Sequence, residues 1–285
     1  MKRIWFLSFF VFPSAFCPIP SAFSSDNTPL GTRSSSLGGA SVSLSDLWSI
    51  QNNQAGLGWM KERTCGIIYQ NQFQIKELST KALGFALPVK NGTFGLCASS
   101  FGYALYSENK VGLSFGKTFG NKISAGISMD YFETAIPEYG KQTSLVAEAG
   151  LQTKPLKNLT LGFHIFNPTR IKLADYNDER IPTIVRLGFN YRFSEKVILT
   201  AETEKDIEKK AMAKAGIEYH PVKALYLRAG ISTNPSLSCF GIGIIVRKFK
   251  LDFSSTYHSI FGFSPQIGLI CEFGKIATRD IQKIN

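Results

Sequence analysis

Apolar residues alternate with small or polar residues along most of the chain. In residues 111–115 and 123–131, apolar side chains occupy the odd positions, while glycine, serine and aspartate occupy the even ones. This period of two is typical of β-strands, because successive side chains point to opposite faces. Residues 120–122, Gly-Asn-Lys, separate the two runs and indicate a tight hairpin turn. The small face of this hairpin carries Gly112, Ser114, Gly116, Ser124 and Gly126.

The alternation continues from residue 65 to residue 273, in runs of roughly nine to twelve residues that are separated by turns. Tilted strands of about 9–11 residues are long enough to cross a bilayer. We therefore predict an all-β fold, a transmembrane antiparallel up-and-down β-barrel of about 14 strands. The strands are expected at residues 66–75, 80–89, 92–107, 109–119, 122–135, 142–154, 158–167, 183–193, 196–206, 211–220, 224–233, 237–247, 249–258 and 264–273.

The connections between these strands alternate in length. Every second connection is short and carries lysine, as at residues 121–122, 157–158 and 222–223. The connections between those are longer, and the longest runs from residue 167 to residue 182. Short turns at one end and longer loops at the other are typical of an outer-membrane barrel, whereas a soluble β-sandwich has no reason to sort its loops.

The last expected strand ends in a recognisable pattern. Gln266 is followed by Gly268 two residues later and then by the terminal aromatic Phe273. This pattern resembles the C-terminal signal that the outer-membrane assembly machinery reads. Residues 274–285 follow it, and we expect them to form a periplasmic tail.

The N-terminus carries an export signal. Lys2 and Arg3 precede an apolar stretch, and Ala22-Phe23-Ser24 forms a small-x-small cleavage site, so residues 1–24 are predicted to be a cleavable signal peptide. The expected location is the cell outer membrane of a Gram-negative type of cell, in contact with outer-membrane lipid. The formal net charge is +11, but an exported chain seldom meets nucleic acid, so we predict no nucleic-acid partner.

The cysteines and histidines do not indicate a reactive site. Cys65, Cys97, Cys239 and Cys271 remain after cleavage and show no CxxC spacing, so neither a zinc site nor a redox pair is predicted. An oxidising compartment permits disulfides, and their presence stays open. The three histidines lie on different strands, and no asparagine or aspartate is placed to orient His258 as a triad requires. We predict no enzymatic activity, no cofactor and no metal site.

Charges of both signs lie on the stripe of the strands that faces away from lipid. The candidate lumen charges are Arg186, Arg192, Glu202, Glu204, Lys214, Glu218 and Arg228. One interpretation is a ligand or ion path, and the other is a ladder of ion pairs that holds the wall together. We favour the ladder, because opposite charges on neighbouring strands satisfy one another and buried ions must be paired.

Residues 31–60 do not alternate like a strand. Ser45 or Asp46 is placed to cap a short helix through residues 47–51, which would stop near Gly56. A Gly- and Ser-rich segment ahead of a barrel can plug its lumen, and the small inward side chains leave room for it. We therefore expect an N-terminal hatch at residues 25–64 and the barrel at residues 65–273.

This segment resembles the hatch of FadL/PorV-like outer-membrane proteins, and the chain as a whole resembles the short PorV/PorQ relatives among them. The matching hatch residues are Gly38, Gly39, Ala40, Asp46, Asn53, Gln54, Ala55 and Gly56, with Gln54 standing where the family has proline. FadL-like members pass hydrophobic small molecules through the hatch and a lateral opening in the wall. PorV-like members act in type IX protein secretion, with secretion-system or exported proteins as partners. From the resemblance we expect a secretion or scaffold role, with transport of hydrophobic small molecules as the alternative.

One strand shows a change of phase that bears on transport. Apolar residues occupy even positions up to Ala98 and odd positions from Phe101, so the phase changes across Ser99 and Ser100. Such a change indicates a β-bulge or a kink, and FadL-like barrels open laterally at a kink in this strand. An ordinary bulge near the barrel rim is the interpretation that we favour, because bulges are common there.

Overall fold

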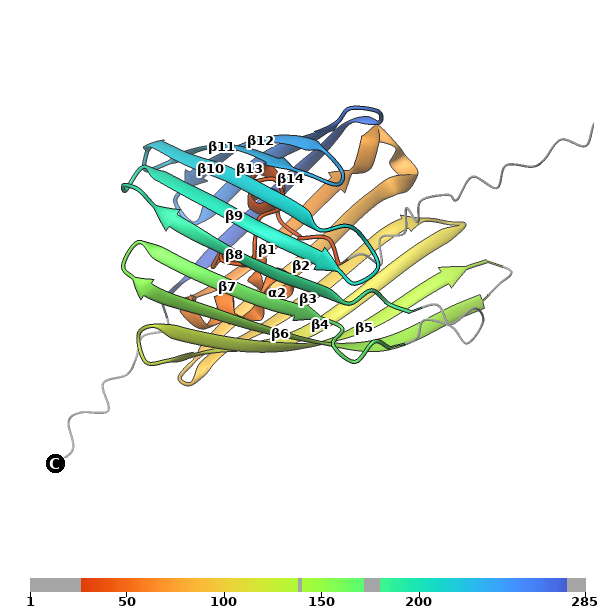
Figure 1. The fold of residues 1–285 in the computed structure, drawn as a ribbon, viewed down its shortest axis with the longest axis horizontal. Coiled ribbons are helices and arrows are strands. Elements are labelled where there is room, and N and C mark those ends of the chain that lie inside the picture. Colours follow the sequence, from red (N-terminus) through yellow and green to blue (C-terminus); the bar gives the residue numbers. More distant parts are fainter. Residues whose placement is uncertain (1–26, 138–139, 172–179, 276–285) are drawn as a thin grey trace, which may run out of the picture.

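The computed structural model describes residues 27–137, 140–171 and 180–275. They form a closed antiparallel barrel of 14 strands, in which each strand pairs with the next in sequence and β1 pairs with β14 to complete the ring (Figure 1). The predicted fold class is therefore confirmed. The predicted signal peptide and most of the predicted C-terminal tail lie outside the described residues.

The elements follow one another in a simple order. The strands are β1 Glu62–Asn71, β2 Ser79–Val89, β3 Gly92–Tyr103, β4 Tyr106–Phe119, β5 Ile123–Ile136, β6 Gly140–Leu156, β7 Leu159–Phe166, β8 Ile184–Arg192, β9 Val197–Asp206, β10 Met212–Val222, β11 Leu225–Ser232, β12 Leu237–Val246, β13 Phe249–His258 and β14 Gly262–Lys275. The helices are α1 Thr32–Ser36 and α2 Ser49–Asn52, with 3-10 turns η1 Gln54–Trp59, η2 Gln72–Gln74 and η3 Lys76–Leu78. Across the described ranges, every helix is too short or too polar to span a membrane.

One predicted turn is misplaced. The sequence pattern put the turn between the third and fourth strands at Glu108, but β3 ends at Tyr103 and β4 begins at Tyr106. Glu108 lies within β4 and pairs with Phe101. The chain turns earlier because Gly102 adopts a φ of 103°, a conformation that glycine tolerates far better than other residues.

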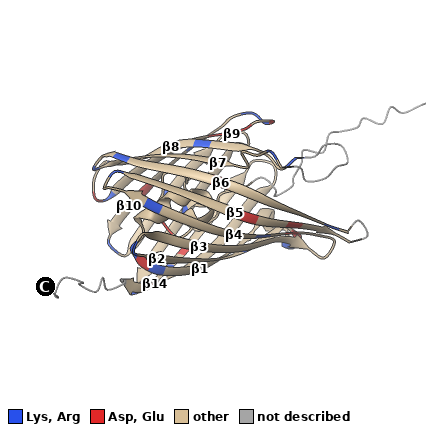
Figure 2. Cartoon of the chain, turned by 90° about the horizontal axis from the view of Figure 1, so that it is seen from below, with Lys and Arg blue, Asp and Glu red and all other residues tan. Residues whose placement is uncertain are grey.

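The outer surface of the barrel is apolar. Leu113 and Ile127 on adjacent strands are 60% and 63% exposed, although both are large aliphatic residues. Most of the wall is uncharged in Figure 2. Exposed apolar area costs about 25 cal/mol per Å² in water, so a continuous apolar belt is stable only against an apolar environment such as lipid. The inward positions between them are small or polar, as with Ser114 and Ser128.

Residues 27–60 run through the inside of the barrel (red in Figure 1). The small inward residues of β4 and β5 lie directly against them, because a Cβ atom at Gly116 or Gly126 would come within 2.3 Å of the Gln54 backbone. The Ser124 hydroxyl donates a hydrogen bond to the Ala55 carbonyl at 2.7 Å. Gly112 differs, because a Cβ there would meet the Asp130 carboxylate of the wall itself. The expectation that Gly112 makes room for the N-terminal segment is therefore wrong.

Candidate functional site

The N-terminal segment, residues 27–60, contacts the barrel wall in two chemically different ways. On one side its apolar residues pack against the wall in a continuous cluster, which we call the apolar side. The segment contributes Leu30, Leu47, Trp48, Ile50 and Leu57, and the wall contributes Ile68, Ala82, Ala86, Cys97 and Ile270. These wall residues belong to β1, β2, β3 and β14. Contacts of this kind are non-directional, so they hold the segment without fixing its register.

On the other side the segment is held by directional hydrogen bonds, and we call this the polar side. One carboxylate oxygen of Glu202 on β9 accepts bonds from the backbone N–H groups of Ser41 and Val42, both at 2.7 Å. The amide nitrogen of Gln152 on β6 donates to the carbonyls of Val42 and Leu44, at 3.0 and 2.8 Å. All of these groups are buried. The wall thus satisfies backbone groups of an irregular segment that have no partners in a helix or strand.

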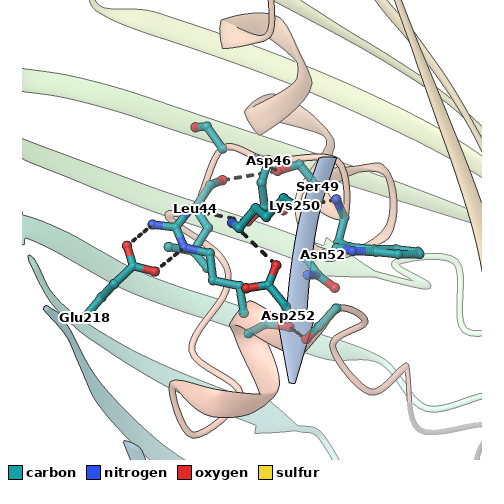
Figure 3. A network of polar contacts seen from close by, with 12 residues as sticks. Leu44, Asp46, Ser49, Asn52, Glu218, Lys250 and Asp252 are labelled. Atoms are coloured by element: carbon teal, nitrogen blue, oxygen red, sulfur yellow. Dashed lines mark hydrogen bonds and ion pairs between the residues drawn. The ribbon is translucent and has the colours of Figure 1, made fainter. Parts of the chain in front are cut away.

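An ion-pair network anchors α1 to the same side (Figure 3). Arg33 donates two bonds to the carboxylate of Glu218 on β10, at 2.9 and 2.7 Å, and lies 3.5 Å from Asp46. Burial alone would lower the pKa of Arg33, but the two carboxylates outweigh it and raise that pKa, so the guanidinium stays charged. Glu218 also accepts a bond from Arg228 on β11, which in turn bonds Asp252 on β13. A two-pronged arginine–carboxylate pair fixes orientation as well as position.

The predicted lumen charges largely meet one another across neighbouring strands. Arg186 lies 2.6 Å from Glu204, and Lys214 lies 3.1 Å from Glu202 and 2.7 Å from Glu204. These contacts match the ladder interpretation of the sequence pattern. Arg192 lies on the same face of β8 as Arg186, opposite the buried Ile198, but it is exposed at the end of the strand, and its role stays a prediction.

The structure brings together a second charged cluster that the sequence analysis missed. Lys110 on β4 lies 2.6 Å from Asp130 and 3.0 Å from Glu148. The other Glu148 oxygen accepts a bond from the Gln54 side chain at 2.6 Å and contacts His164 at 3.0 Å. The sequence did carry a signal for this cluster. Lys110 and Asp130 both stand at the even positions of the alternating pattern, which face inward.

The residues of the predicted hatch motif have local roles in shaping the segment. Gly38 and Gly39 adopt positive φ values of 72° and 81°, and a Cβ at Gly38 would come 2.3 Å from the Ile231 carbonyl oxygen. The Asn53 side chain accepts a bond from Ala55 N–H and donates to the Val42 carbonyl at 2.6 Å. Of the rest, Ala40 is buried, and Gly56 lies so close to Ser49 that a Cβ would clash with its hydroxyl.

The predicted helix cap is wrong. The sequence pattern placed a helix through residues 47–51 with Ser45 or Asp46 as its cap, but α2 begins at Ser49 and has no side-chain cap. Asp46 instead accepts a hydrogen bond from the N–H of Trp48 at 3.0 Å, ahead of the helix. An aspartate that satisfies a backbone N–H two residues on forms a turn, and this turn delays the helix.

The predicted kink at Ser99 and Ser100 is absent. Both residues pair in unbroken register with β2 on one side and β4 on the other. The phase of the apolar pattern changes because Phe101 faces inward and is buried, while Ser100 faces outward. An apolar residue on the inward face therefore accounts for the pattern, and no β-bulge is needed.

The residues of the predicted assembly signal lie on both faces of β14. Gln266 is buried, and a Cβ at Gly268 would come 2.3 Å from the Thr32 hydroxyl of α1. Phe273 is exposed on the outer surface. Their role in assembly stays a prediction.

A pocket opens between the start of the N-terminal segment and strands β2 to β5. It contains about 430 Å³ of empty space, part of which is open to solvent. Leu30, Phe101 and Phe132 supply its apolar lining, and Ser99 also borders it. The Asn27 side chain is almost fully buried at its edge, and its amide nitrogen has no hydrogen-bond partner among the described residues. Leu30 belongs both to this lining and to the apolar side, so the pocket borders the apolar side.

Solved structures share this fold, although no protein-family model and no curated protein matches the chain. The monoaromatic hydrocarbon channel CymD aligns with a TM-score of 0.66 at 13% identity, covering 87% of this chain and 98% of that one. The toluene transporter TbuX of Ralstonia pickettii aligns with a TM-score of 0.64 at 11% identity, covering 88% and 99%. A FadL homologue of Pseudomonas aeruginosa aligns with a TM-score of 0.57 at 13% identity, covering 85% and 96%. Likeness at these identities shows a common fold.

Proposed function

We propose that this protein is a non-enzymatic channel of the outer membrane that passes hydrophobic small molecules. The observation that carries the proposal is the pocket bordered by Leu30, Phe101 and Phe132, because Leu30 also belongs to the apolar side of the lumen. Ligand pockets combine apolar side chains with a few polar groups that orient the ligand, and this pocket has Gln51 and Lys110 beside its apolar residues.

The structural neighbours favour the same role. Their titles name channels and transporters for monoaromatic hydrocarbons and toluene, and another neighbour is an outer membrane protein of Acinetobacter baumannii. This supports the alternative of the sequence analysis over its first choice. A secretion or scaffold role gains no support from these neighbours, and the PorV/PorQ resemblance stays a prediction.

In this proposal residues 27–60 act as a hatch. A solute that enters the pocket meets Leu30 and then the apolar side, where it displaces only non-directional contacts. The polar side keeps the segment in register while this happens, because its hydrogen bonds and ion pairs are directional and buried. Passage through the lumen requires no break in the pairing of β3, in keeping with the unbroken register at Ser99 and Ser100.

Uptake of toluene tests the proposal. Cells that express the protein should accumulate radiolabelled toluene faster than cells that lack it. Ser99→Trp places an indole in the pocket and should return uptake to the level of cells without the protein. Ser100→Trp is the matched control on the same strand, because this side chain faces outward. Equal uptake with and without the wild-type protein would exclude toluene transport, and equal loss in both variants would exclude the pocket as the route.

A further inference from the structure

The barrel closes at a seam between its first and last strands. Within the described strands, β1 and β14 are the only neighbours that are not consecutive in the sequence. Every other pair is joined by a connection that limits how far its strands can separate. Backbone hydrogen bonds and side-chain contacts alone therefore hold the seam closed.

Two cysteines face each other across this seam. Cys65 of β1 and Cys271 of β14 are direct partners in the antiparallel register. Both occupy the alternating positions that point outward, in step with the exposed residues Ile67 and Leu269. Two side chains at opposed positions on the same face of a sheet are nearest neighbours.

The spacing of such a pair suits a covalent link. Directly opposed residues of antiparallel strands have Cα atoms about 4.5 or about 5.5 Å apart. A disulfide bridges Cα atoms that are about 4.4–6.8 Å apart. Both thiols are free and half-buried in this structure, and bridging them requires no change in register.

The surroundings leave the two thiols within reach of water. Cys65 also pairs with Phe85 on β2, and Cys271 also pairs with Phe249 on β13, and both rings are exposed. These four residues lie near the start of β1 and the end of β14, beside the short turn that contains Lys248. A band of outward aromatic side chains near the strand ends is typical of the interface between membrane and water.

We propose that Cys65 and Cys271 form a disulfide that locks the barrel seam. The remaining two cysteines are not part of it, because Cys97 and Cys239 are buried on β3 and β12. This inference is independent of the proposed function, since it depends only on the register of the closed barrel.

The reaction is a two-electron oxidation by thiol–disulfide exchange. The thiolate of one cysteine attacks the disulfide of a periplasmic dithiol oxidase, and a mixed disulfide forms. The second thiolate then attacks the cysteine sulfur of that mixed disulfide, which forms the S–S bond of the seam. The two protons and two electrons that the cysteines lose end on the oxidase, whose disulfide is reduced to two thiols.

The state of each cysteine can be measured on protein from native membranes. Cells are quenched in acid, dissolved in SDS and alkylated with N-ethylmaleimide, then reduced and alkylated with iodoacetamide before peptide mass spectrometry. We expect N-ethylmaleimide on Cys97 and Cys239, and iodoacetamide on Cys65 and Cys271. A peptide pair joined through Cys65 and Cys271 should appear when reduction is omitted. N-ethylmaleimide on all four cysteines would overturn the proposal.

Serine variants add a measurement of thermal stability. The link closes a very long loop, so reductant should lower the temperature at which the folded band is lost in SDS by on the order of 10 °C. Cys65→Ser should lower it equally and abolish the effect of reductant. Cys97→Ser is the matched control, and its folded band should still respond to reductant. A wild-type barrel that does not respond to reductant would contradict a lock at the seam.

Discussion

The two sides of the lumen hold the N-terminal segment by different means. The apolar side, on β14 and β1 to β3, packs Leu47, Trp48 and Ile50 against apolar wall residues, and its Cys97 thiol donates a weak hydrogen bond to Gln51 of the segment at 3.9 Å. The polar side uses Glu202, Gln152 and other wall groups to bind single backbone atoms. Directional bonds select one position of the segment, whereas apolar contacts stabilise many similar ones. The comparison indicates that contacts on the apolar side can be displaced by a hydrophobic solute while the polar side keeps the segment in position.

The largest expected effect comes from filling the space between the wall and the N-terminal segment. Gly126→Val would place a side chain on the Gln54 backbone, so the segment and the wall could not both keep their positions. The folded, heat-modifiable barrel should be lost from outer membranes on gel analysis. Gly112→Val is the matched control on the neighbouring strand, because its nearest neighbours are the Asp130 and Ser128 side chains of the wall, and it should retain more folded protein. Equal folding of the two variants would contradict the close fit of segment and wall.

A smaller effect is expected from breaking the polar side alone. Glu202→Ala leaves two N–H groups of the segment without their acceptor, at a cost of about 1–3 kcal/mol for each group, while Lys214 keeps Glu204 as its partner. Hydrogen exchange at Ser41 and Val42 should accelerate strongly. Glu204→Ala is the control, since this residue is two positions along the same strand and bonds only wall side chains. It should destabilise the wall and leave the exchange at Ser41 and Val42 slower than in Glu202→Ala. The reverse order would show that the segment is not held by Glu202.

The smallest change loosens the apolar side. Ile50→Val removes one buried methyl group at a cost of about 0.5–1.5 kcal/mol, and we expect faster toluene uptake with the barrel intact. Ile198→Val is the matched control, because this buried isoleucine of β9 belongs neither to the apolar side nor to the pocket lining. Both variants should lose similar stability, but only the first should change uptake. An equal change in uptake would mean that general loosening, rather than the apolar side, controls passage.

The alternating pattern was enough to predict the barrel. A period of two is a local property, and it puts each residue on a definite face whatever its partners are. The predicted and observed strands therefore agree closely, from the second strand, 80–89 against Ser79–Val89, to the thirteenth, 249–258 in both. The pattern failed at Phe101, where an inward apolar residue imitated a kink, because hydrophobicity alone does not distinguish lipid from an apolar pocket.

The sequence by itself determined the strands, their two faces and the wall charges that pair with their neighbours. Only the tertiary structure decided what those faces meet. Lys110, Asp130, Glu148 and His164 form one cluster because consecutive strands β4 to β7 align them, and register is not a local property. Cys65 and Cys271 show no motif in the sequence, yet closure of the barrel makes them direct partners. Ring closure joins the two ends of the strand series, so contacts at the seam follow from the whole fold.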